Sequence, residues 1–266
     1  SHTTFSDGVL TPQELVSRAV ENGVDVLAIT DHDTLDAYRD TPLQQDNIRL
    51  VAGIELSTQW RSTGIHVLGL NIDPDADSII AAAKSQSEAR LRRARRIGEN
   101  LQKKGVDGAF DGALKLSNGT YIGRPHFAQY LVNIGKVDSI SAAFRKYMGD
   151  GKAGDVKQQW AALPKIIAWI RDANGIAVLA HPLKYKLTRT RLKRLLDDFV
   201  DAGGQGMEVV SGQQLPQQTN DMAQLCEQRK LLASCGSDFH MPGRHWAELG
   251  RFAPLPGNVT PVWEQF

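Results

Sequence analysis

The chain has 266 residues, 41% of them hydrophobic and 23% charged, which is ordinary for one large globular α/β domain or for a domain with an insert. The formal net charge of +1 excludes a bulk attraction to nucleic acid, so any RNA contact must come from local patches. No run approaches the ~20 apolar residues of a membrane span, no signal peptide is visible, and two cysteines without a disulfide framework suit a reducing cytosol, so we expect a cytoplasmic protein.

The first predicted elements are a capped helix and a series of buried strands. Residues 11–14, Thr-Pro-Gln-Glu, form a capping box with proline at the first helical position, and the helix should run to Asn22. Residues 24–30 are apolar and rich in β-branched side chains, which is typical of a strand covered on both faces. Two more apolar runs predict strands that end at Glu55 and His66.

The middle of the chain is predicted to be helical. Residues 76–104 have the pattern of one long polar helix, residues 105–122 that of a glycine-rich loop, and further helices should begin near residues 123 and 139. The three glycines in 149–155 suggest a return linker. We therefore expect a small helical insert at residues 76–155.

Regular alternation of strands and helices resumes after this linker. The predicted helices are 163–174, 189–202 and 216–229, and the predicted strands are 176–180, 207–210 and 231–235. Such alternation with right-handed crossovers predicts a parallel sheet or barrel. We assign residues 1–75 and 156–266 to this α/β barrel.

Metal-competent side chains follow the predicted strands. Because the active sites of α/β folds lie at the carboxyl ends of strands, the stretch around His32 and five further segments should deliver these side chains to one rim. Imidazole and carboxylate are the usual ligands of Zn, Mn and Fe, so the set predicts a multinuclear metal site. Any single member could instead be a core histidine or a turn cap, but the motifs reinforce one another. The members are His2, Asp7, His32, Glu55, His66, His181, Asp238 and His240.

The same motifs resemble a known family. Ser-His-Thr-Thr-Phe-Ser-Asp-Gly, Ile-Thr-Asp-His-Asp-Thr, Gly-Ile-Glu, the isolated His66, Ala-His-Pro and Gly-Ser-Asp-Phe-His are similar, in order, to the motifs of the PHP (polymerase and histidinol phosphatase) domain. The resemblance implies a distorted seven-stranded β/α (TIM-like) barrel of the PHP type with a helical insert. The family's first motif is His-x-His and only its second histidine is present, as His2, so we expect the other histidine and the first barrel strand before Ser1.

The resemblance also implies three divalent metal ions. His2, Glu55 and Asp238 would hold the first, Glu55, His66 and His181 the second, and Asp7, His32 and His240 the third. Catalysis should depend most on Glu55, Asp7, His32 and His240, while Asp31 and Asp33 would orient imidazoles. Mixed nitrogen and oxygen ligands favour Mn²⁺, with Fe²⁺ or Zn²⁺ as alternatives, over Mg²⁺. Such ions acidify bound water and neutralise phosphate oxygens, so a phosphoester is the expected substrate.

Residues 123–126, Gly-Arg-Pro-His, predict the substrate-binding end. Arg124 would lie at a helix start, where free N–H groups and a guanidinium suit a phosphate, and His126 would lie beside it, although both could be ordinary helical residues. This motif in a helical insert resembles nucleoside-3′,5′-bisphosphate phosphatases and 5′→3′ exoribonucleases of the RNase AM type. The resemblance implies that a hydroxide bridging two metals removes the 3′-phosphate of a nucleoside 3′,5′-bisphosphate, or nucleotides from the 5′ end of short 5′-phosphorylated RNA.

Three alternatives stay open. The five arginines of residues 90–96 favour a solvated helix face over RNA contact, with Leu91, Ala94, Gly98 and Leu101 as a buried stripe. A histidinol-phosphate-type monoesterase would share the fold but would not explain Arg124. A vestigial, non-catalytic PHP module would be expected to have lost ligands. The sequence indicates no membrane contact and no obligate protein partner, and it leaves open the native metal, the main substrate and the oligomeric state.

Overall fold

A computed structural model describes residues 1–39, 47–117, 121–157 and 160–266. Contacts between residues divide the chain into two compact units. Ser1–Lys84 together with Ala161–Phe266 form one, here called the sheet unit, and Ser85–Trp160 form the other, here called the helical unit. Across the described residues, no helix combines the length and apolar character that crossing a bilayer requires.

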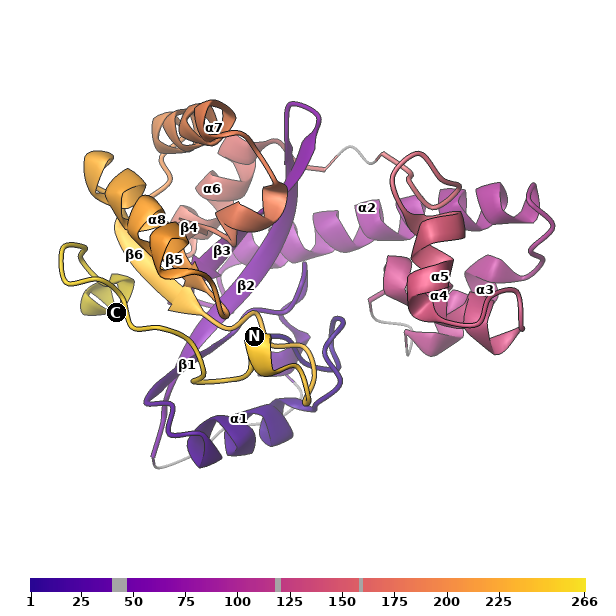
Figure 1. Ribbon diagram of the computed structural model, residues 1–266, viewed down its shortest axis with the longest axis horizontal. Coiled ribbons are helices and arrows are strands. Elements are labelled where there is room, and N and C mark those ends of the chain that lie inside the picture. Colours follow the sequence, from indigo (N-terminus) through magenta and orange to yellow (C-terminus); the bar gives the residue numbers. More distant parts are fainter. Residues whose placement is uncertain (40–46, 118–120, 158–159) are drawn as a thin grey trace. The chain divides into compact units, whose positions relative to one another are not determined.

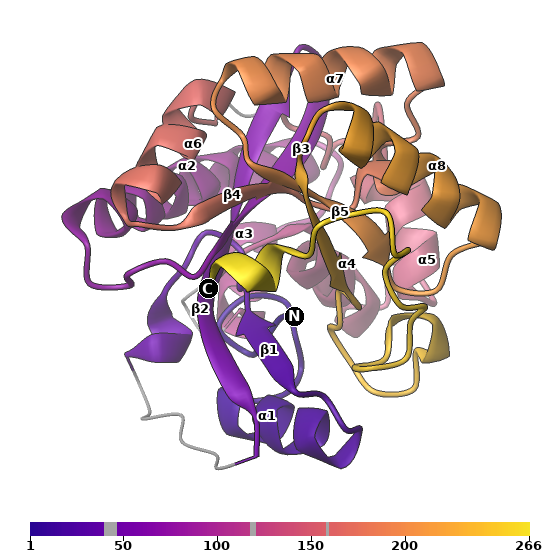
Figure 2. The same ribbon diagram turned by 90° about the vertical axis from the view of Figure 1, so that its left-hand side faces the viewer.

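The sheet unit is built on a curled, mixed sheet of six strands that pair in chain order. The helices of this unit lie around the outside of the curl (Figures 1 and 2). The strands are β1 (Val26–Ile29), β2 (Arg49–Trp60), β3 (Thr63–Leu70), β4 (Ile176–Leu179), β5 (Gly206–Ser211) and β6 (Leu232–Gly236). The helices are α1 (Pro12–Glu21), α6 (Leu163–Asp172), α7 (Arg189–Asp201) and α8 (Pro216–Gln228). The described residues form six strands, and a seventh stays a prediction.

The expectation of a parallel sheet is confirmed for β4, β5 and β6 but is wrong at β2 and β3. These strands form an antiparallel hairpin, β3 also runs antiparallel to β4, and the remaining pairs are parallel. The predicted strand ends at Glu55 and His66 are wrong as well, because β2 continues to Trp60 and β3 to Leu70. A short turn at Arg61, whose φ is 53°, lets both strands continue past the acid and the histidine.

The core lies between the sheet and the helices around it. Leu15 and Val16 of α1 pack with β1, while the other helices share one apolar cluster with the hairpin. That cluster includes Ile54, Leu56, Ile65, Val67, Ile166, Ile170, Leu195, Phe199, Val209 and Met222. The opposite face of the sheet carries a smaller cluster around Leu68 and Val178, so the central strands are covered on both sides. This packing fixes the strands that carry or precede the polar side chains.

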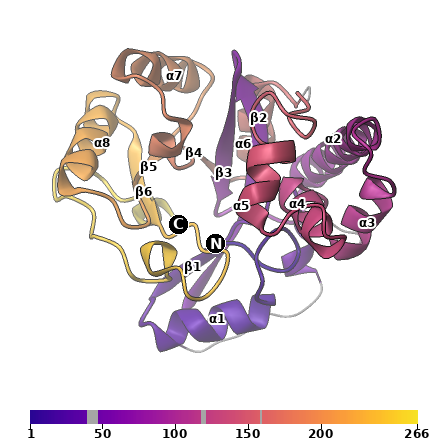
Figure 3. The same ribbon diagram turned by 45° about the vertical axis from the view of Figure 1, so that its right-hand side comes forward.

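The first residues of the chain lie between the segments that follow β1 and β6. Thr30, just after β1, donates its backbone N–H to the carbonyl of Ser1 at 2.8 Å. The N–H of His2 donates to the carbonyl of Phe239, beyond β6, at 2.9 Å. Figure 3 shows this terminus beside β1. The imidazole of His2 is thereby fixed where the two edges of the sheet approach each other.

The helical unit contains most of α2 (Asp77–Gln102), followed by α3 (Ala109–Leu116), α4 (Arg124–Asn133), α5 (Ile140–Ala143) and a π-helical turn at Phe144–Met148. The predicted loop at 105–122 is wrong, because α3 lies within it. Gly112 lies within this helix and allows close packing against α4. A Cβ at this position would lie 2.1 Å from the ring of Tyr130. The core of this unit includes Ile97, Leu101, Phe127, Leu131 and Met148.

The arginine-rich part of α2 is solvated only in part. Arg92, Arg95 and Arg96 are exposed, as the solvated interpretation requires. Arg90 is buried instead, with its guanidinium 4.1 Å from the ring of Tyr121 and 5.2 Å from that of Trp160. The predicted buried stripe holds at Ala94, Gly98 and Leu101 but is wrong at Leu91, which is exposed.

Candidate metal centre

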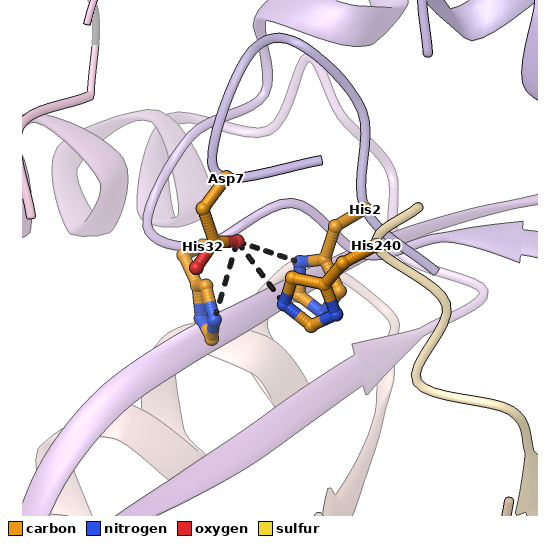
Figure 4. Close-up of side chains that lie close together, drawn as sticks. All are labelled: His2, Asp7, His32 and His240. Carbon is orange, nitrogen blue, oxygen red and sulfur yellow. Dashed lines mark ion pairs between the residues drawn. The ribbon is translucent and has the colours of Figure 1, made fainter. Parts of the chain in front are cut away.

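Four side chains from three distant segments meet at Asp7. Its Oδ1 lies 3.2 Å from Nε2 of His240, 3.8 Å from Nε2 of His32 and 3.9 Å from Nδ1 of His2 (Figure 4). The rings of His2 and His240 stack with centroids 4.2 Å apart. Each of the four residues offers one ligand atom within 4.8 Å of the others, so together they could hold a metal ion.

Glu55 is the centre of the remaining contacts. Its Oε1 lies 2.5 Å from Nδ1 of His66 and 3.0 Å from Nε2 of His181. Its Oε2 lies 3.2 Å from Nε2 of His2, and that same nitrogen lies 3.2 Å from Oδ1 of Asp238. With 2% of its surface exposed, Glu55 is a buried carboxylate surrounded by imidazoles.

All eight predicted side chains therefore come together, but they group differently from the three sets expected. Two further groups could hold an ion: His2 with Glu55 and Asp238, and His32 with Glu55 and His66. The first matches a predicted set. In the second, His32 stands where His181 was expected, although His181 also contacts Glu55. His2 and His32 each belong to two groups, so the ligand sets overlap.

The sheet explains how distant residues meet. The segment after β1 continues beside β2, because Asp33 donates its N–H to the carbonyl of Glu55 at 2.9 Å and Glu55 donates to that of Asp31 at 3.1 Å. This pairing brings His32 next to Glu55. On β3, His66 is opposite Ser57, which shares a face of β2 with Glu55, so the imidazole reaches the carboxylate diagonally.

Backbone strain is present at two of the eight residues. His181 has φ 29° and Asp238 has φ 53°, both in the left-handed region that residues with a Cβ rarely adopt. Each residue follows the end of a strand, β4 or β6. Strained backbone of this kind clusters at functional sites, where the surrounding structure holds it.

Asp31 acts on the site through hydroxyl groups. It accepts hydrogen bonds from the backbone N–H and the Oγ1 of Thr3 at 2.7 and 2.6 Å, and from Oγ of Ser6 at 2.5 Å. Oγ of Ser6 lies 3.4 Å from Nδ1 of His2. Asp33 accepts bonds from the N–H and Oγ of Ser57 at 2.8 and 2.9 Å. Asp31 therefore orients His2 indirectly, and Asp33 fixes β2 beside His66.

The electrostatics of the site suit a divalent cation. Burial raises the pKa of the Glu55 carboxyl, but the surrounding imidazoles of His32, His66, His181 and His2 together hold that pKa well below its usual range. Burial lowers the pKa of His32 to about 3, so its imidazole is neutral. For His2, burial lowers the pKa while hydrogen bonds to Asp238 and Glu55 raise it, to about 10. Glu55 beside His32 is therefore an ionised carboxylate beside a neutral imidazole, the donor set that Zn, Mn and Fe take in proteins, whereas His2 would have to release its proton to bind an ion.

Three residues near the site were not predicted from the sequence. Lys184 forms an ion pair with Oδ2 of Asp238. Glu208 accepts a 2.5 Å hydrogen bond from the N–H of His181, and burial raises the pKa of this carboxyl. The hydroxyl of Tyr185 donates to the carbonyl of Ala180 at 2.7 Å. An acid in the otherwise apolar strand β5 was the signal for Glu208, whereas Lys184 and Tyr185 carry no signal beyond following the His-Pro motif.

Arg124 and His126 lie in the helical unit at the start of α4. Arg124 donates from Nη1 to the carbonyl of Met148 at 3.4 Å, and Nδ1 of His126 accepts the N–H of Gly123 at 3.1 Å. His126 therefore caps the helix with one ring nitrogen. Burial lowers the pKa of Arg93 to about 10, assisted by the neighbouring charges of Arg124 and Arg90. Three arginines are thus close together in this unit.

The chain is similar to proteins of known family. The PHP domain matches residues 1–173. A 5′-3′ exoribonuclease of Haemophilus influenzae is 43% identical over 100% of this chain and 97% of its own length. A 3′,5′-nucleoside bisphosphate phosphatase of Chromobacterium violaceum is 40% identical over 99% of this chain and 94% of its own length.

Solved structures agree with this assignment. An amidohydrolase from Chromobacterium violaceum, with bound sulfate and no metal, superimposes with a TM-score of 0.88 at 39% identity, covering 99% of this chain and 93% of that one. A Bifidobacterium adolescentis protein described as a metal-dependent phosphoesterase gives a TM-score of 0.75 at 28% identity, covering 98% and 91%. The motifs, the curled sheet and relatives that match over nearly the whole length lead to one conclusion: the chain belongs to the PHP domain family.

Proposed function

We propose that the protein is a metal-dependent phosphoesterase that removes the 3′-phosphate of nucleoside 3′,5′-bisphosphates and shortens 5′-phosphorylated RNA from its 5′ end. The observation that carries this proposal is the buried Glu55 carboxylate, in contact with His2, His66 and His181 at 2.5–3.2 Å. Relatives at 40–45% identity are named for these two activities. The family supplies the reaction class, and the helical unit supplies the argument for a nucleotide.

The eight side chains fit three divalent ions, with Mn²⁺ favoured and Fe²⁺ or Zn²⁺ as alternatives. His2, Glu55 and Asp238 would hold one, Asp7, His32 and His240 another, and Glu55, His66 and His181 a third, with His2 and His32 close enough to serve a neighbouring ion. Bound ions would acidify water and neutralise the oxygens of a phosphate under attack. Glu55 has two oxygens, and each faces a different set of imidazoles, so it is the residue suited to bridging.

The protein's own residues keep these ligands in place. Asp31 holds Ser6 against His2, and Glu208 holds the strained backbone of His181 through its N–H. Such supporting bonds fix ring orientation, and their loss typically costs 10- to 100-fold in metal affinity or activity, as an order of magnitude. Lys184, paired with Asp238 and half-exposed, places a positive charge at the edge of the site, where it suits a phosphate oxygen.

Arg124 is proposed to bind the phosphate that does not react. It occupies the first position of a ten-residue helix, where the macrodipole favours an anion. The charges of Arg124 and Arg90 disfavour the charged form of the half-buried Arg93, and a bound phosphate would relieve this repulsion. His126 supports the same helix start through its bond to Gly123. The helical unit thus offers an anion site made chiefly of arginines.

The proposal is tested by metal analysis together with a substrate panel. Purified protein should contain divalent metal and release phosphate from adenosine 3′,5′-bisphosphate, and it should release mononucleotides from 5′-phosphorylated RNA. Histidinol phosphate should be a poor substrate. Protein that binds no metal and hydrolyses neither nucleotide substrate would support the vestigial module, and a preference for histidinol phosphate would support the monoesterase.

Arg124→Ala provides the residue-level test. Loss of one partner of a charge-assisted pair should cost about 2–4 kcal/mol in kcat/KM for adenosine 3′,5′-bisphosphate. Arg124→Lys should recover only part, because a point charge cannot reproduce the planar fork. A small phosphomonoester without a second phosphate should be hydrolysed equally by all three proteins. The exposed Arg96→Ala is the matched control. If the ratio of kcat/KM for the bisphosphate to kcat/KM for the monoester is unchanged in Arg124→Ala, Arg124 does not take part in substrate binding.

A further inference from the structure

The two units of this chain carry opposite net charge. Residues 85–160 contain 14 Lys or Arg and 7 Asp or Glu, a formal charge of +7, whereas the rest of the chain contains 17 and 23, a charge of −6. The overall charge of +1 conceals this difference. A strongly basic unit attracts polyanions over a Debye length, roughly 10 Å at moderate ionic strength. The local patch that RNA contact requires should therefore be sought in the helical unit.

Exposed cations gather around one groove of this unit, which has a volume of about 460 Å³. The groove is formed by the loop after α4, the end of α5, the π-helical turn and the turn that follows it. Asp138 is the single carboxylate in its lining, and among the residues that the structure describes no ion pair joins it to a cation of the groove. The cations are Lys136, Arg145, Lys146 and Lys152.

Backbone hydrogen bonds, rather than ion pairs, shape the groove. The N–H of Gly149 donates to the carbonyl of Phe144 at 2.7 Å, which closes the π-helical turn. Met148 is fully buried, while the intervening Arg145 and Lys146 face solvent. The N–H of Lys152 donates to the carbonyl of Gly149 at 3.0 Å, which fixes the next turn. π-helical turns often occur at functional sites, and here one presents two cations side by side.

We infer that this groove binds the phosphate backbone of single-stranded RNA beyond the terminal nucleotide. The inference rests on the proposed function. A nucleoside bisphosphate has two phosphates, and the metal centre and Arg124 account for both. A mononucleotide would leave the cations of the groove without a phosphate to bind. They suit instead the additional phosphates of an oligonucleotide; these cations are Lys136, Arg145, Lys146 and Lys152. Contacts to phosphate carry no sequence information, so binding should be independent of sequence.

The experiment compares two pairs of substitutions that remove the same charge from the same unit. Lys146→Gln with Lys152→Gln neutralises the groove, and Lys103→Gln with Lys104→Gln is the control at exposed positions outside its lining. Binding of a 5′-phosphorylated ten-nucleotide RNA, with the metal present as Ca²⁺ to slow cleavage, is followed by fluorescence anisotropy over a range of salt concentrations. Hydrolysis of adenosine 3′,5′-bisphosphate and of the same RNA is measured in parallel with Mn²⁺.

The groove variant should bind the RNA about 10-fold more weakly, and its slope of log Kd against log salt should fall by up to about 0.7 for each lost contact. Its kcat/KM for the bisphosphate should be unchanged, and the control should stay within about twofold of wild type in RNA binding. Equal weakening of RNA binding in both variants would show that binding depends on the total positive charge of the unit and not on the groove. That outcome, or no weakening in either variant, would overturn the inference. If wild type hydrolyses neither substrate, the proposed function fails, while the binding comparison still tests the groove.

Discussion

The two units of this chain use charged side chains in opposite ways. In the sheet unit, Glu55 and the histidines around it are buried and in direct contact, so each group sets the ionisation of the next. In the helical unit, Lys136, Arg145, Lys146 and Lys152 are exposed and held by the backbone. A buried cluster should fail when one residue is lost, whereas an exposed basic surface should weaken gradually. The comparison therefore predicts the size of each mutational effect.

Glu55→Ala should have the largest effect. It removes the carboxylate that both of the Glu55-containing candidate groups share, so the protein should lose more than one metal equivalent. Residues that act as a unit give very large losses, and we expect kcat/KM to fall by more than about 10³-fold for any phosphoester. Metal analysis and turnover are measured together. The exposed Glu264→Ala is the control, and full metal content in Glu55→Ala would show that the two groups do not share this ligand.

His240→Ala should have a smaller but still large effect. His240 belongs to one candidate group and contacts Asp7 at 3.2 Å, so its loss should affect a single ion. We expect activity to fall about 10²- to 10³-fold with the fold retained, and His32→Ala should lose at least as much because His32 belongs to two candidate groups. Near-ultraviolet circular dichroism checks the fold, and metal titration counts the sites. If His240→Ala turns over at the wild-type rate at matched metal content, His240 does not take part in catalysis.

The convergence of the candidate side chains could be predicted because most of them lie in or after an apolar run that predicts a strand. Asp31-His32-Asp33 follows β1, and Asp238 and His240 follow β6, whereas His2 and Asp7 follow no such run and were indicated by the family motif. The ligand groups could not be predicted in full, since the contact of His32 with Glu55 depends on the pairing of the segment after β1 with β2. The antiparallel pairing of β3 with β2 and β4 could not be predicted, because an apolar run does not show whether its neighbour is parallel or antiparallel.

The errors in the helical unit have a different origin. Gly112 suggested a loop, but it allows Tyr130 to pack against α3. Arg90 suggested a solvated face, but it is covered by Tyr121 and Trp160, which follow it by about 30 and 70 residues along the chain, a separation that no local pattern reveals. Helical periodicity shows which face is apolar and does not show which long side chain folds back under an aromatic ring.

Arg90 is the exception to the rule for exposed charges in the helical unit. Arg90→Met should destabilise this unit by about 1–3 kcal/mol, because it removes two cation–π contacts from a side chain that is 7% exposed. Hydrogen exchange of α3 and α4 amides measures local opening in this unit. The exposed Arg92→Met should change exchange little. Equal exchange in the two variants would mean that the buried guanidinium contributes nothing beyond its charge.

The smallest expected effect concerns an ion pair at the surface of the sheet unit. Arg18 on α1 donates from Nε and Nη2 to the two carboxylate oxygens of Glu248 at 2.9 and 2.7 Å. These bonds lower the pKa of Glu248 below its usual 4.5. Because the folded pKa is depressed, the pair stabilises the protein above pH 4.5, and this stabilisation is lost as pH falls through the folded pKa.

Glu248→Gln should therefore cost about 0.5–1 kcal/mol at pH 7, since the Arg18 side chain is 32% exposed and water screens the pair. The difference from wild type should shrink as the pH is lowered below 4.5, where the wild-type carboxyl begins to take up the proton that glutamine mimics. Urea unfolding in the presence of a chelator measures this difference without a contribution from bound metal. Glu264→Gln, at an exposed position of the sheet unit, is the control. A cost of several kcal/mol, or one that persists at low pH, would place this pair with the buried cluster around Glu55 rather than with the screened charges of the surface.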